Sequence, residues 1–223
     1  MPPDSYQIRL CPSCGLRYPL TDGNNFGTRC PACLGETRLL LTRSLLTHPA
    51  RPLPDSFHRE GGGSAKKVWK AALLDNVRSA WNVGSIFRSA DGFGFAHAYL
   101  CGITPTPESE AVRKTSLGAE DNVTWSYHKD ALKLANGLKK EGWQVWSLEA
   151  DPRAISISTA AISKENFPVI LIVGNEITGV DPGMLDLSDR IFYIPMHGEK
   201  TSFNVAIAFG IAAYQFAYIR LRA

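Results

Sequence analysis

The sequence of 223 residues predicts an α/β protein, in which a parallel sheet with helices on both faces follows a small metal-binding domain. From residue 68 onward, short apolar runs alternate with helical patterns, as they do in a parallel sheet covered by helices. Several of these runs are apolar at every position, which is typical of strands buried on both faces. Four cysteines between positions 11 and 33 predict the metal-binding domain.

Five strands, with three helices between them, are expected in the α/β part before its last helix. The strands are the apolar runs Val68–Leu74, Ala98–Cys101, Val145–Leu148, Val169–Val173 and Ile191–Ile194. The helices are expected near 83–91, 108–115 and 130–141. Runs this short do not fix the order of the strands in the sheet.

The chain divides into three zones. Residues 1–46 hold the cysteines and short apolar runs separated by turn residues, which predicts paired short strands. Residues 47–67 are rich first in proline and then in glycine, which predicts a linker. Residues 68–223 form the α/β domain.

The composition excludes disordered, fibrous and membrane-embedded classes, because 44% hydrophobic and 20% charged residues are ordinary for a globular protein. The first residues lack the basic and apolar regions of a secretory signal, so a cytoplasmic location is expected. In that reducing compartment, clustered cysteines indicate a metal site rather than disulfides.

The net charge of +3 does not identify a partner. Residues 1–66 carry eight Lys or Arg against five Asp or Glu, and residues 67–223 carry sixteen of each sign. Four thiolates around a divalent metal would bring the front segment close to +1. Any argument for a partner must therefore come from local patches.

The segment 204–222 is apolar on nearly every face. Gln215 interrupts it and leaves fewer than the roughly 20 apolar residues that a bilayer requires, so no membrane span is expected. A helix that is apolar all round has to be covered on all sides. We therefore expect part of this helix to pack against a second subunit in a homodimer.

The cysteines form two C-x2-C pairs, Cys11 with Cys14 and Cys30 with Cys33, separated by fifteen residues. Two such pairs complete the tetrahedral sulfur shell of structural zinc, and residues 1–46 then form a zinc ribbon. Iron in the same shell and a redox dithiol are the alternatives. Gly15 and Gly35 follow the pairs, where tight turns favour glycine.

Basic and aromatic residues surround the cysteines. They are Arg9, Arg17, Arg29, Arg38 and Arg43, with Tyr18 and Phe26 between them. This pattern suits phosphate contacts and base stacking, but it is equally typical of a solvated basic surface.

Phosphate-loop, serine-hydrolase, zinc-protease and dinucleotide motifs are absent from the sequence. Three other segments place polar residues and glycine at element ends, where sites on parallel sheets lie. The first runs from Asn82 through Gly84 to Arg88, the second is Gly174-Asn-Glu176 after an apolar strand, and the third is Ile194-Pro-Met196-His-Gly198 followed by Ser202-Phe203-Asn204. Taken singly, Asn82, Ser202 and Asn204 are also candidate helix caps, and Glu176 a solvated turn carboxylate.

In this order the three motifs resemble those of the SpoU (TrmH-like) RNA ribose 2′-O-methyltransferases of the SPOUT superfamily. The resemblance covers about residues 68–223. Phe203 stands where leucine is usual in that family, and Ala206 where serine is common. A zinc ribbon is not part of the family pattern.

The resemblance implies a deep trefoil knot near the C-terminus that holds S-adenosylmethionine, and a homodimer that joins the motifs of two subunits. By the same matching, the cofactor site is formed by Gly174, Ile194, Met196 and Phe203. The RNA-binding and catalytic side is formed by Asn82, Arg88, Glu176, Ser202 and Asn204.

The expected function is methyl transfer to a ribose 2′-hydroxyl of structured tRNA or rRNA. Arg88 matches the residue proposed as the base in this family, although a guanidinium stays protonated in proteins and suits a phosphate contact better. A non-catalytic RNA-binding or assembly protein with the same fold is the alternative. A DNA-binding regulator is a third, for which the sequence offers no recognition helix.

Overall fold

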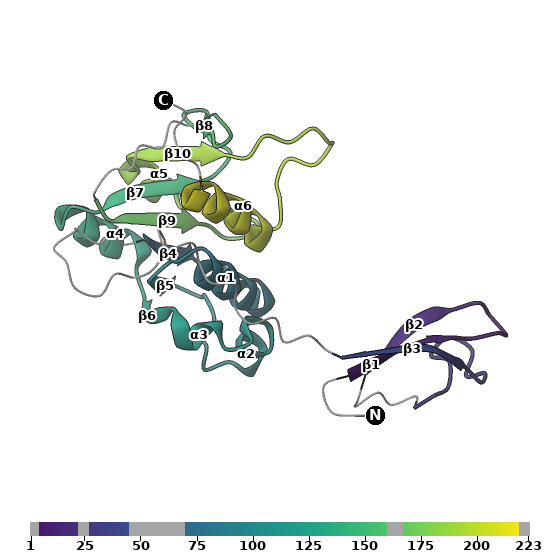
Figure 1. Cartoon of the computed structure of the whole chain (residues 1–223). Coiled ribbons are helices and arrows are strands. Elements are labelled where there is room, and N and C mark those ends of the chain that lie inside the picture. Colours follow the sequence, from purple (N-terminus) through teal and green to yellow (C-terminus); the bar gives the residue numbers. More distant parts are fainter. Residues whose placement is uncertain (1–4, 22–26, 45–69, 160–166, 219–223) are drawn as a thin grey trace. The chain divides into compact units, whose positions relative to one another are not determined.

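The computed structural model describes residues 5–21, 27–44, 70–159 and 167–218, which belong to two compact units (Figure 1). The first unit contains the described residues up to 44, and the second contains those from 70 onward. The linker predicted at 47–67 and the start of the strand predicted at 68 lie outside the described residues. Among the described residues, no helix combines the length and apolar character needed to cross a bilayer.

The first unit is a three-stranded antiparallel sheet. Its strands are β1 (Ser5–Leu10), β2 (Arg17–Thr21) and β3 (Arg38–Ser44), in the order β2-β1-β3. The turns between the strands carry the cysteines. The predicted paired short strands are confirmed.

The second unit contains a seven-stranded sheet in the order β6-β5-β4-β9-β7-β10-β8, with every pairing parallel. The strands are β4 (Lys70–Asp75), β5 (His97–Cys101), β6 (Thr124–His128), β7 (Gln144–Leu148), β8 (Ile155–Ser156), β9 (Val169–Val173) and β10 (Arg190–Tyr193). The five predicted strands are confirmed within two residues at each described end. The edge strands β6 and β8 were not predicted.

Six helices accompany this sheet in the described part of the chain. They are α1 (Ala80–Gly92), α2 (Glu110–Ser116), α3 (Ala119–Asn122), α4 (Ala131–Lys140), α5 (Pro182–Leu187) and α6 (Val205–Tyr218). The helices predicted near 83–91, 108–115 and 130–141 correspond to α1, α2 and α4. The short helices α3 and α5 were not predicted.

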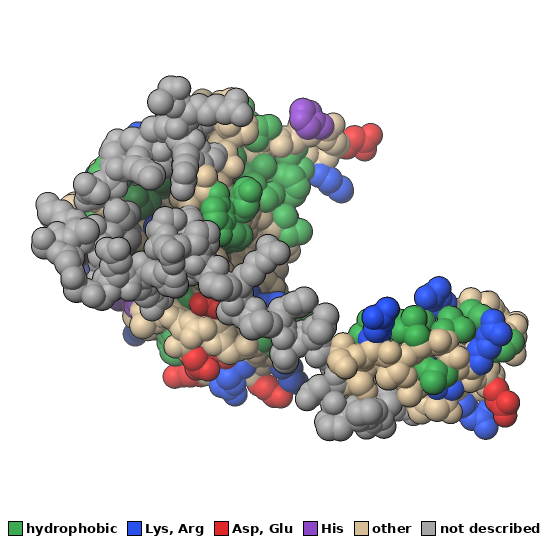
Figure 2. Space-filling view, in the orientation of Figure 1, with side chains coloured by type: hydrophobic (Ala, Val, Ile, Leu, Met, Phe, Trp, Pro, Cys, Tyr) green, Lys and Arg blue, Asp and Glu red, His purple; other side chains and the backbone are tan. Residues whose placement is uncertain are grey.

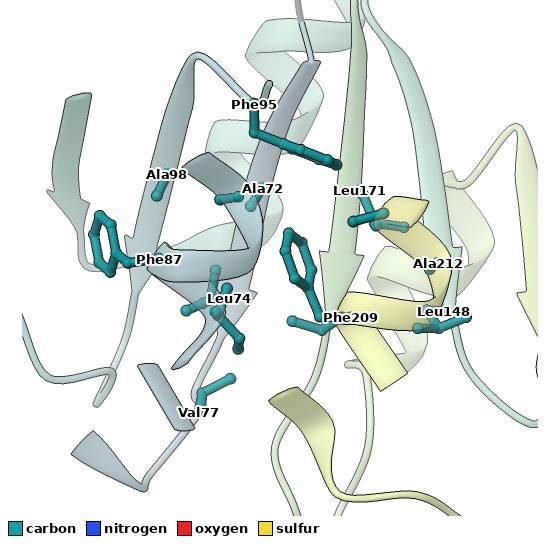
Figure 3. Close-up of a cluster of buried hydrophobic side chains, with 14 of the residues drawn as sticks. Ala72, Leu74, Val77, Phe87, Phe95, Ala98, Leu148, Leu171, Phe209 and Ala212 are labelled. Carbon is teal, nitrogen blue, oxygen red and sulfur yellow. The ribbon is translucent and has the colours of Figure 1, made fainter. Parts of the chain in front are cut away.

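Both faces of the sheet are covered, as predicted. In β4, Ala72 and Leu74 belong to one buried cluster, and Ala71 and Leu73 belong to the other. The first cluster includes buried residues of α1 and α6, such as Phe87 (Figure 3), and the second includes those of α4 and α5. The alternation follows from strand geometry, because successive side chains point to opposite faces of a sheet.

The last helix is covered on one face only within a single chain, so the expected contact of its other face with a second subunit stays a prediction. Phe209 and Ala212 are fully buried against the sheet, whereas Ile207 and Tyr214 are each 55% exposed. Figure 2 shows hydrophobic side chains gathered where Figure 1 places α6. Within one chain, α6 therefore has a buried face and an apolar face open to solvent.

Candidate active site and metal centre

The four clustered cysteines converge at one point of the ribbon. Their sulfur atoms all lie within 4.8 Å of one another, and the Sγ–Sγ distances of Cys11 to Cys33 and of Cys14 to Cys30 are both 3.5 Å. Zinc–sulfur bonds of about 2.3 Å in a tetrahedron place the sulfurs about 3.8 Å apart, so the arrangement fits zinc. The four side chains fill the shell, which makes a bound metal structural rather than catalytic.

The two cysteine turns share one backbone pattern. Cys11 accepts a hydrogen bond from the N–H of Gly15 at 2.9 Å, and Cys30 accepts one from Leu34 at 2.9 Å. Gly15 has φ +76°, and Leu34 has φ +60°. The left-handed position predicted at Gly35 therefore falls on Leu34, where it strains a residue with a Cβ. The backbone of Cys14 lowers the pKa of the Cys11 thiol to about 6, whereas hydrogen bonding to the Cys11 sulfur raises the pKa of the Cys33 thiol to about 12.

A cavity of about 720 Å³ opens at the carboxyl ends of β7, β9 and β10. Its lining comes from residues 148–150, from residues 173–179, and from a segment that runs from Tyr193 to Ala208. Clefts outside the carboxyl ends of parallel strands are where α/β proteins bind ligands. The volume lies within the range of small-molecule sites, roughly 300–1,000 Å³.

All four residues predicted to bind a cofactor line this cavity, namely Gly174, Ile194, Met196 and Phe203. Glu176, Ser202 and Asn204 line it as well. The second and third sequence motifs thus meet at one cavity although about 20 residues separate them. The roles assigned to these residues stay predictions.

The turn after β9 is closed on itself. Asn175 and Gly179 exchange two backbone hydrogen bonds of 3.0 and 2.9 Å. A Cβ on Gly174 would lie 2.2 Å from the carbonyl carbon of Gly179, so no larger residue fits there. The side chain of Asn175 donates to the carbonyl of Asn76 at 2.8 Å and thereby ties this turn to the end of β4. Glycine at position 174 is a packing requirement of the cavity wall.

Glu176 extends from this turn to the start of α1. Its carboxylate accepts hydrogen bonds from the backbone N–H groups of Arg78 at 2.9 Å and Ser79 at 3.0 Å. It also accepts one from the side-chain amide of Asn82 at 3.0 Å. Partial burial acts to raise the pKa of Glu176, but these hydrogen bonds outweigh it and lower the pKa. The carboxylate is therefore anionic at neutral pH and neutralises the positive end of α1.

Asn82 lies between the first and third motifs. Its side-chain oxygen accepts a hydrogen bond of 3.0 Å from the amide of Asn204, and its nitrogen donates to Glu176. Asn82 is not a helix cap, because Ser79 caps α1 and accepts the N–H of Asn82 at 3.3 Å. A chain of hydrogen bonds thus runs Glu176–Asn82–Asn204, with one member from each motif.

Asn204 is a helix cap as well as a member of this chain. Its side-chain oxygen accepts the N–H groups of Ala206 and Ile207 at 2.9 and 3.3 Å, which satisfies the first turn of α6. Both interpretations of Asn204 therefore hold at once. The side chain of Ser202 is exposed at the cavity and makes no hydrogen bond to the described residues.

Arg88 lies apart from the other predicted residues. It is exposed on α1, on the same stripe as Trp81 and Ser85, and it does not line the cavity. Within the described residues its guanidinium has no hydrogen-bond or ion-pair partner. Within one polypeptide chain, Asn82 is linked to the cavity through its hydrogen bonds to Glu176 and Asn204, whereas Arg88 lies on another side of the helix.

Sequence reasoning missed Glu149. This residue follows β7 directly and lines the cavity, where its carboxylate accepts the N–H groups of Ala150 and Val180, each at 2.9 Å. The signal was present in the sequence, because a carboxylate after a predicted strand of a parallel sheet lies at the same edge as the ends of its neighbours.

Comparisons with solved structures agree with this architecture. An rRNA methyltransferase of Sinorhizobium meliloti, solved with AdoMet bound, matches with a TM-score of 0.62 and 25% identity over 68% of this chain and 56% of its own. A protein of Porphyromonas gingivalis, described as a putative RNA methyltransferase of the TrmH family, matches with a TM-score of 0.61 and 26% identity over 88% of this chain and 72% of its own.

Sequence comparison gives the same result. A tRNA (guanosine(18)-2′-O)-methyltransferase of Aquifex aeolicus is 31% identical over 154 residues, which make up 64% of this chain and 66% of that protein. The chain therefore spans slightly less than two thirds of this relative's length. The family model described as "SpoU rRNA Methylase family" matches residues 71–214, which include all three motifs and the whole cavity lining. The chain belongs to the SpoU rRNA methylase family.

Proposed function

We propose that this protein transfers a methyl group from S-adenosylmethionine to a ribose 2′-hydroxyl of tRNA or rRNA. The observation that carries the proposal is the cavity at the ends of β7, β9 and β10, bordered by the hydrogen-bonded chain Glu176–Asn82–Asn204. The names of the Aquifex and Sinorhizobium proteins, a tRNA and an rRNA methyltransferase, support both RNA classes.

The cavity suits S-adenosylmethionine in size and in lining. Apolar side chains such as Ile194, Met196 and Phe203 offer surfaces for an adenine ring, and the turn at Gly174 exposes backbone groups beside them. Glu149 and Ser202 supply polar groups in the same wall. A mostly apolar lining with few polar groups is the usual design of a small-molecule site. When bound, S-adenosylmethionine supplies a methyl group activated by a sulfonium.

The hydrogen-bonded residues Glu176, Asn82 and Asn204 contribute to catalysis mainly by positioning the substrate. Asn82 is held from both sides, by Glu176 and by Asn204, so its orientation is fixed before substrate arrives. Holding an oxygen nucleophile in line with its target contributes several kcal/mol to a reaction of this kind. Ser202 lies at the same edge of the cavity, and its hydroxyl, which none of the described residues engages, is placed to contact the ribose or its phosphate.

Arg88 enters this site only if a second copy of the chain brings it there. The exposed stripe of α1 also presents Trp81, which is 67% exposed and lies two helical turns before Arg88. The open apolar face of α6, with Ile207 and Tyr214, is a surface that a second copy would cover. A homodimer thus accounts for both the uncovered helix face and the separation of Arg88 from the cavity. Sedimentation of the protein as a monomer at micromolar concentration would contradict it.

The trefoil knot and the cytoplasmic location are part of the same proposal. The segments that follow β9 and β10 line one cavity, which a knot in this region would enclose. Reduced cysteine ligands and an RNA substrate both favour the cytoplasm.

Methyl transfer to RNA from cells that lack the protein tests the proposal. The purified chain is incubated with labelled S-adenosylmethionine and this RNA, and the labelled nucleotide is located by 2′-O-methyl mapping. We expect the label to be incorporated at one ribose. RNA from wild-type cells, which is already methylated there, should accept no label. Binding of S-adenosylmethionine and RNA with no transfer to any RNA would contradict it and favour a non-catalytic RNA-binding protein.

A further inference from the structure

One face of the ribbon sheet collects cations, and none of the described residues on this face is acidic. Residues directly opposite each other in a sheet project from the same face. The pairing of β1 with β2 and β3 places Arg17 and Arg38 on either side of Leu10, and Arg43 opposite Tyr6. These five side chains therefore share a face, which we call the arginine face.

Apolar side chains lie between the two ends of the arginine face. Ile8 is opposite Pro19 on β2 and Leu41 on β3, so a short apolar row crosses the sheet at its middle. Tyr6 and Leu10 are four residues apart on β1, which corresponds to about 13 Å. Guanidinium groups thus flank an apolar and aromatic strip on both sides.

The burial pattern shows that this face is the open one. In β2, Arg17 and Pro19 are exposed, whereas Tyr18 and Leu20, on the opposite face, are buried. Arg9 belongs to the buried face, where its guanidinium donates to the side chain and the carbonyl of Thr37, each at 2.8 Å. Arg9 and Tyr18, both included in the basic pattern predicted from the sequence, are therefore structural, and Phe26 lies outside the described residues.

The three arginines of this face are electrostatically uncompensated within the described residues. Arg17, Arg38 and Arg43 make no hydrogen bond or ion pair there. In the described part of the ribbon, Glu36 is the single acidic residue, and its backbone forms an isolated antiparallel β-bridge with Arg29 outside the three-stranded sheet. Figure 2 shows Lys and Arg side chains interspersed with hydrophobic ones over this unit.

We propose that the arginine face binds a single-stranded segment of RNA, with Tyr6 and the apolar row against the bases and the three arginines on the phosphates. Arginine pairs with phosphate through two parallel hydrogen bonds, and bases stack on aromatic and apolar surfaces. A second copy of the same face is excluded as the occupant, since six uncompensated cations would meet. The inference rests on the proposed function, because it assigns the ribbon to the same RNA that the cavity would methylate.

Direct binding tests this inference on the full, zinc-loaded chain. The probe is a fluorescent 12-nucleotide single-stranded RNA, and its anisotropy is followed without S-adenosylmethionine at several salt concentrations. The variant R17Q/R38Q/R43Q is expected to bind at least tenfold more weakly. Each lost phosphate contact reduces the slope of log affinity against log salt by about 0.7 for a single strand, so a decrease of about 2 is expected.

Matched variants separate this face from the charge of the ribbon as a whole. Arg29→Gln removes a cation of the same unit from outside the face and is expected to change affinity less than twofold. Tyr6→Ala should weaken binding several-fold, and Tyr6→Phe should restore it, since the ring is kept. Unchanged zinc content shows that each variant keeps its fold.

The outcomes distinguish the face from the active site. Unchanged RNA affinity in R17Q/R38Q/R43Q would overturn the arginine face and leave the proposed methyl transfer intact. Equal affinity for an RNA duplex of the same length would overturn the assignment to single strands. Binding that depends on the face, in a protein that methylates no RNA, would support this inference while contradicting the proposed function.

Discussion

The two units of this protein derive their stability from different sources. In the ribbon, the buried hydrophobic residues among those described are Cys11, Tyr18, Leu20 and Cys30, too few for an independent core. The second unit buries two apolar layers, one on each face of its sheet. A bound metal therefore stabilises the ribbon in the way that side-chain packing stabilises the α/β unit. Each unit should therefore respond to a different perturbation.

Removal of the metal should have the largest effect. Structural zinc contributes roughly 10–16 kcal/mol to the folding of small domains, so Cys11→Ser with Cys14→Ser should unfold the ribbon. The α/β unit should keep its thermal transition in calorimetry, because its core contains no metal. Ser13→Ala, in the same turn but not a ligand, is the control and should retain zinc. A parallel fall in the melting temperature of the α/β unit would show that the units are not independent.

Truncation of a side chain in the α/β core should destabilise the α/β unit and leave the ribbon unchanged. Phe209 is fully buried and packs on Phe95 with ring centroids 5.2 Å apart. Phe209→Ala should cost about 3–5 kcal/mol of the free energy of unfolding, measured with urea, because it leaves a cavity. Ile103→Ala, at a side chain that is 64% exposed, should cost less than about 0.5 kcal/mol. Zinc content should not change in either variant. Loss of zinc in Phe209→Ala would contradict the claim that the two units are stabilised independently.

The carboxylate at the start of α1 should show a smaller, pH-dependent effect. Its hydrogen bonds lower the pKa of Glu176 in the folded chain. The stability it provides is therefore complete above its pKa in the unfolded chain and is lost as pH falls through the lower folded-state pKa. Relative to wild type, Glu176→Gln should be less stable at pH 7, and the difference should disappear in acid. Methyl transfer should fall about tenfold, since Asn82 loses its charged partner.

A difference that persists unchanged at pH 3 would mean that the charge of Glu176 is not involved. Asp130→Asn provides a matched change of charge at another helix start, since Asp130 caps α4 through the N–H of Lys133 at 2.9 Å. That variant should leave methyl transfer intact.

The smallest effect is expected in the second cysteine turn. Leu34 has φ +60° and is 57% exposed, so Leu34→Gly should relieve backbone strain at little cost in packing. The ribbon should become more stable by about 1 kcal/mol, seen as zinc retention at higher chelator concentration. Gly15→Ala, at φ +76° with open space around a Cβ, should lower the stability of the ribbon by a similar amount. Equal zinc retention in both variants would contradict the strain argument.

The fold was predictable where strands are uniformly apolar. The strand at Val169–Val173 was predicted to the residue, since five apolar residues in a row are buried on both faces. The edge strand at Thr124–His128 was missed because it contains no continuous apolar run, although its small polar and aromatic residues alternate as in a partly buried strand. β8, with two residues, and α5, with six, are too short to show any period.

The site was predictable where glycine and polar residues follow a strand directly. That pattern identified Gly174 and Glu176, which line the cavity. It could not reveal the position of Arg88, because six residues along a helix place a side chain about 120° away from Asn82 around the axis. The hydrogen bond between Asn82 and Asn204 was likewise beyond sequence reasoning, as 122 residues separate them.

A double-mutant cycle on Asn82 and Asn204 tests the convergence of the motifs most directly. Asn204→Ser keeps a cap on α6 but removes the amide that donates to Asn82, and Asn82→Ala removes the acceptor. Measured as kcat/KM for methyl transfer to RNA, the two substitutions should be non-additive by about 1 kcal/mol, so the double variant is only slightly slower than the worse single variant. Losses that simply multiply would show that the two side chains act at separate places.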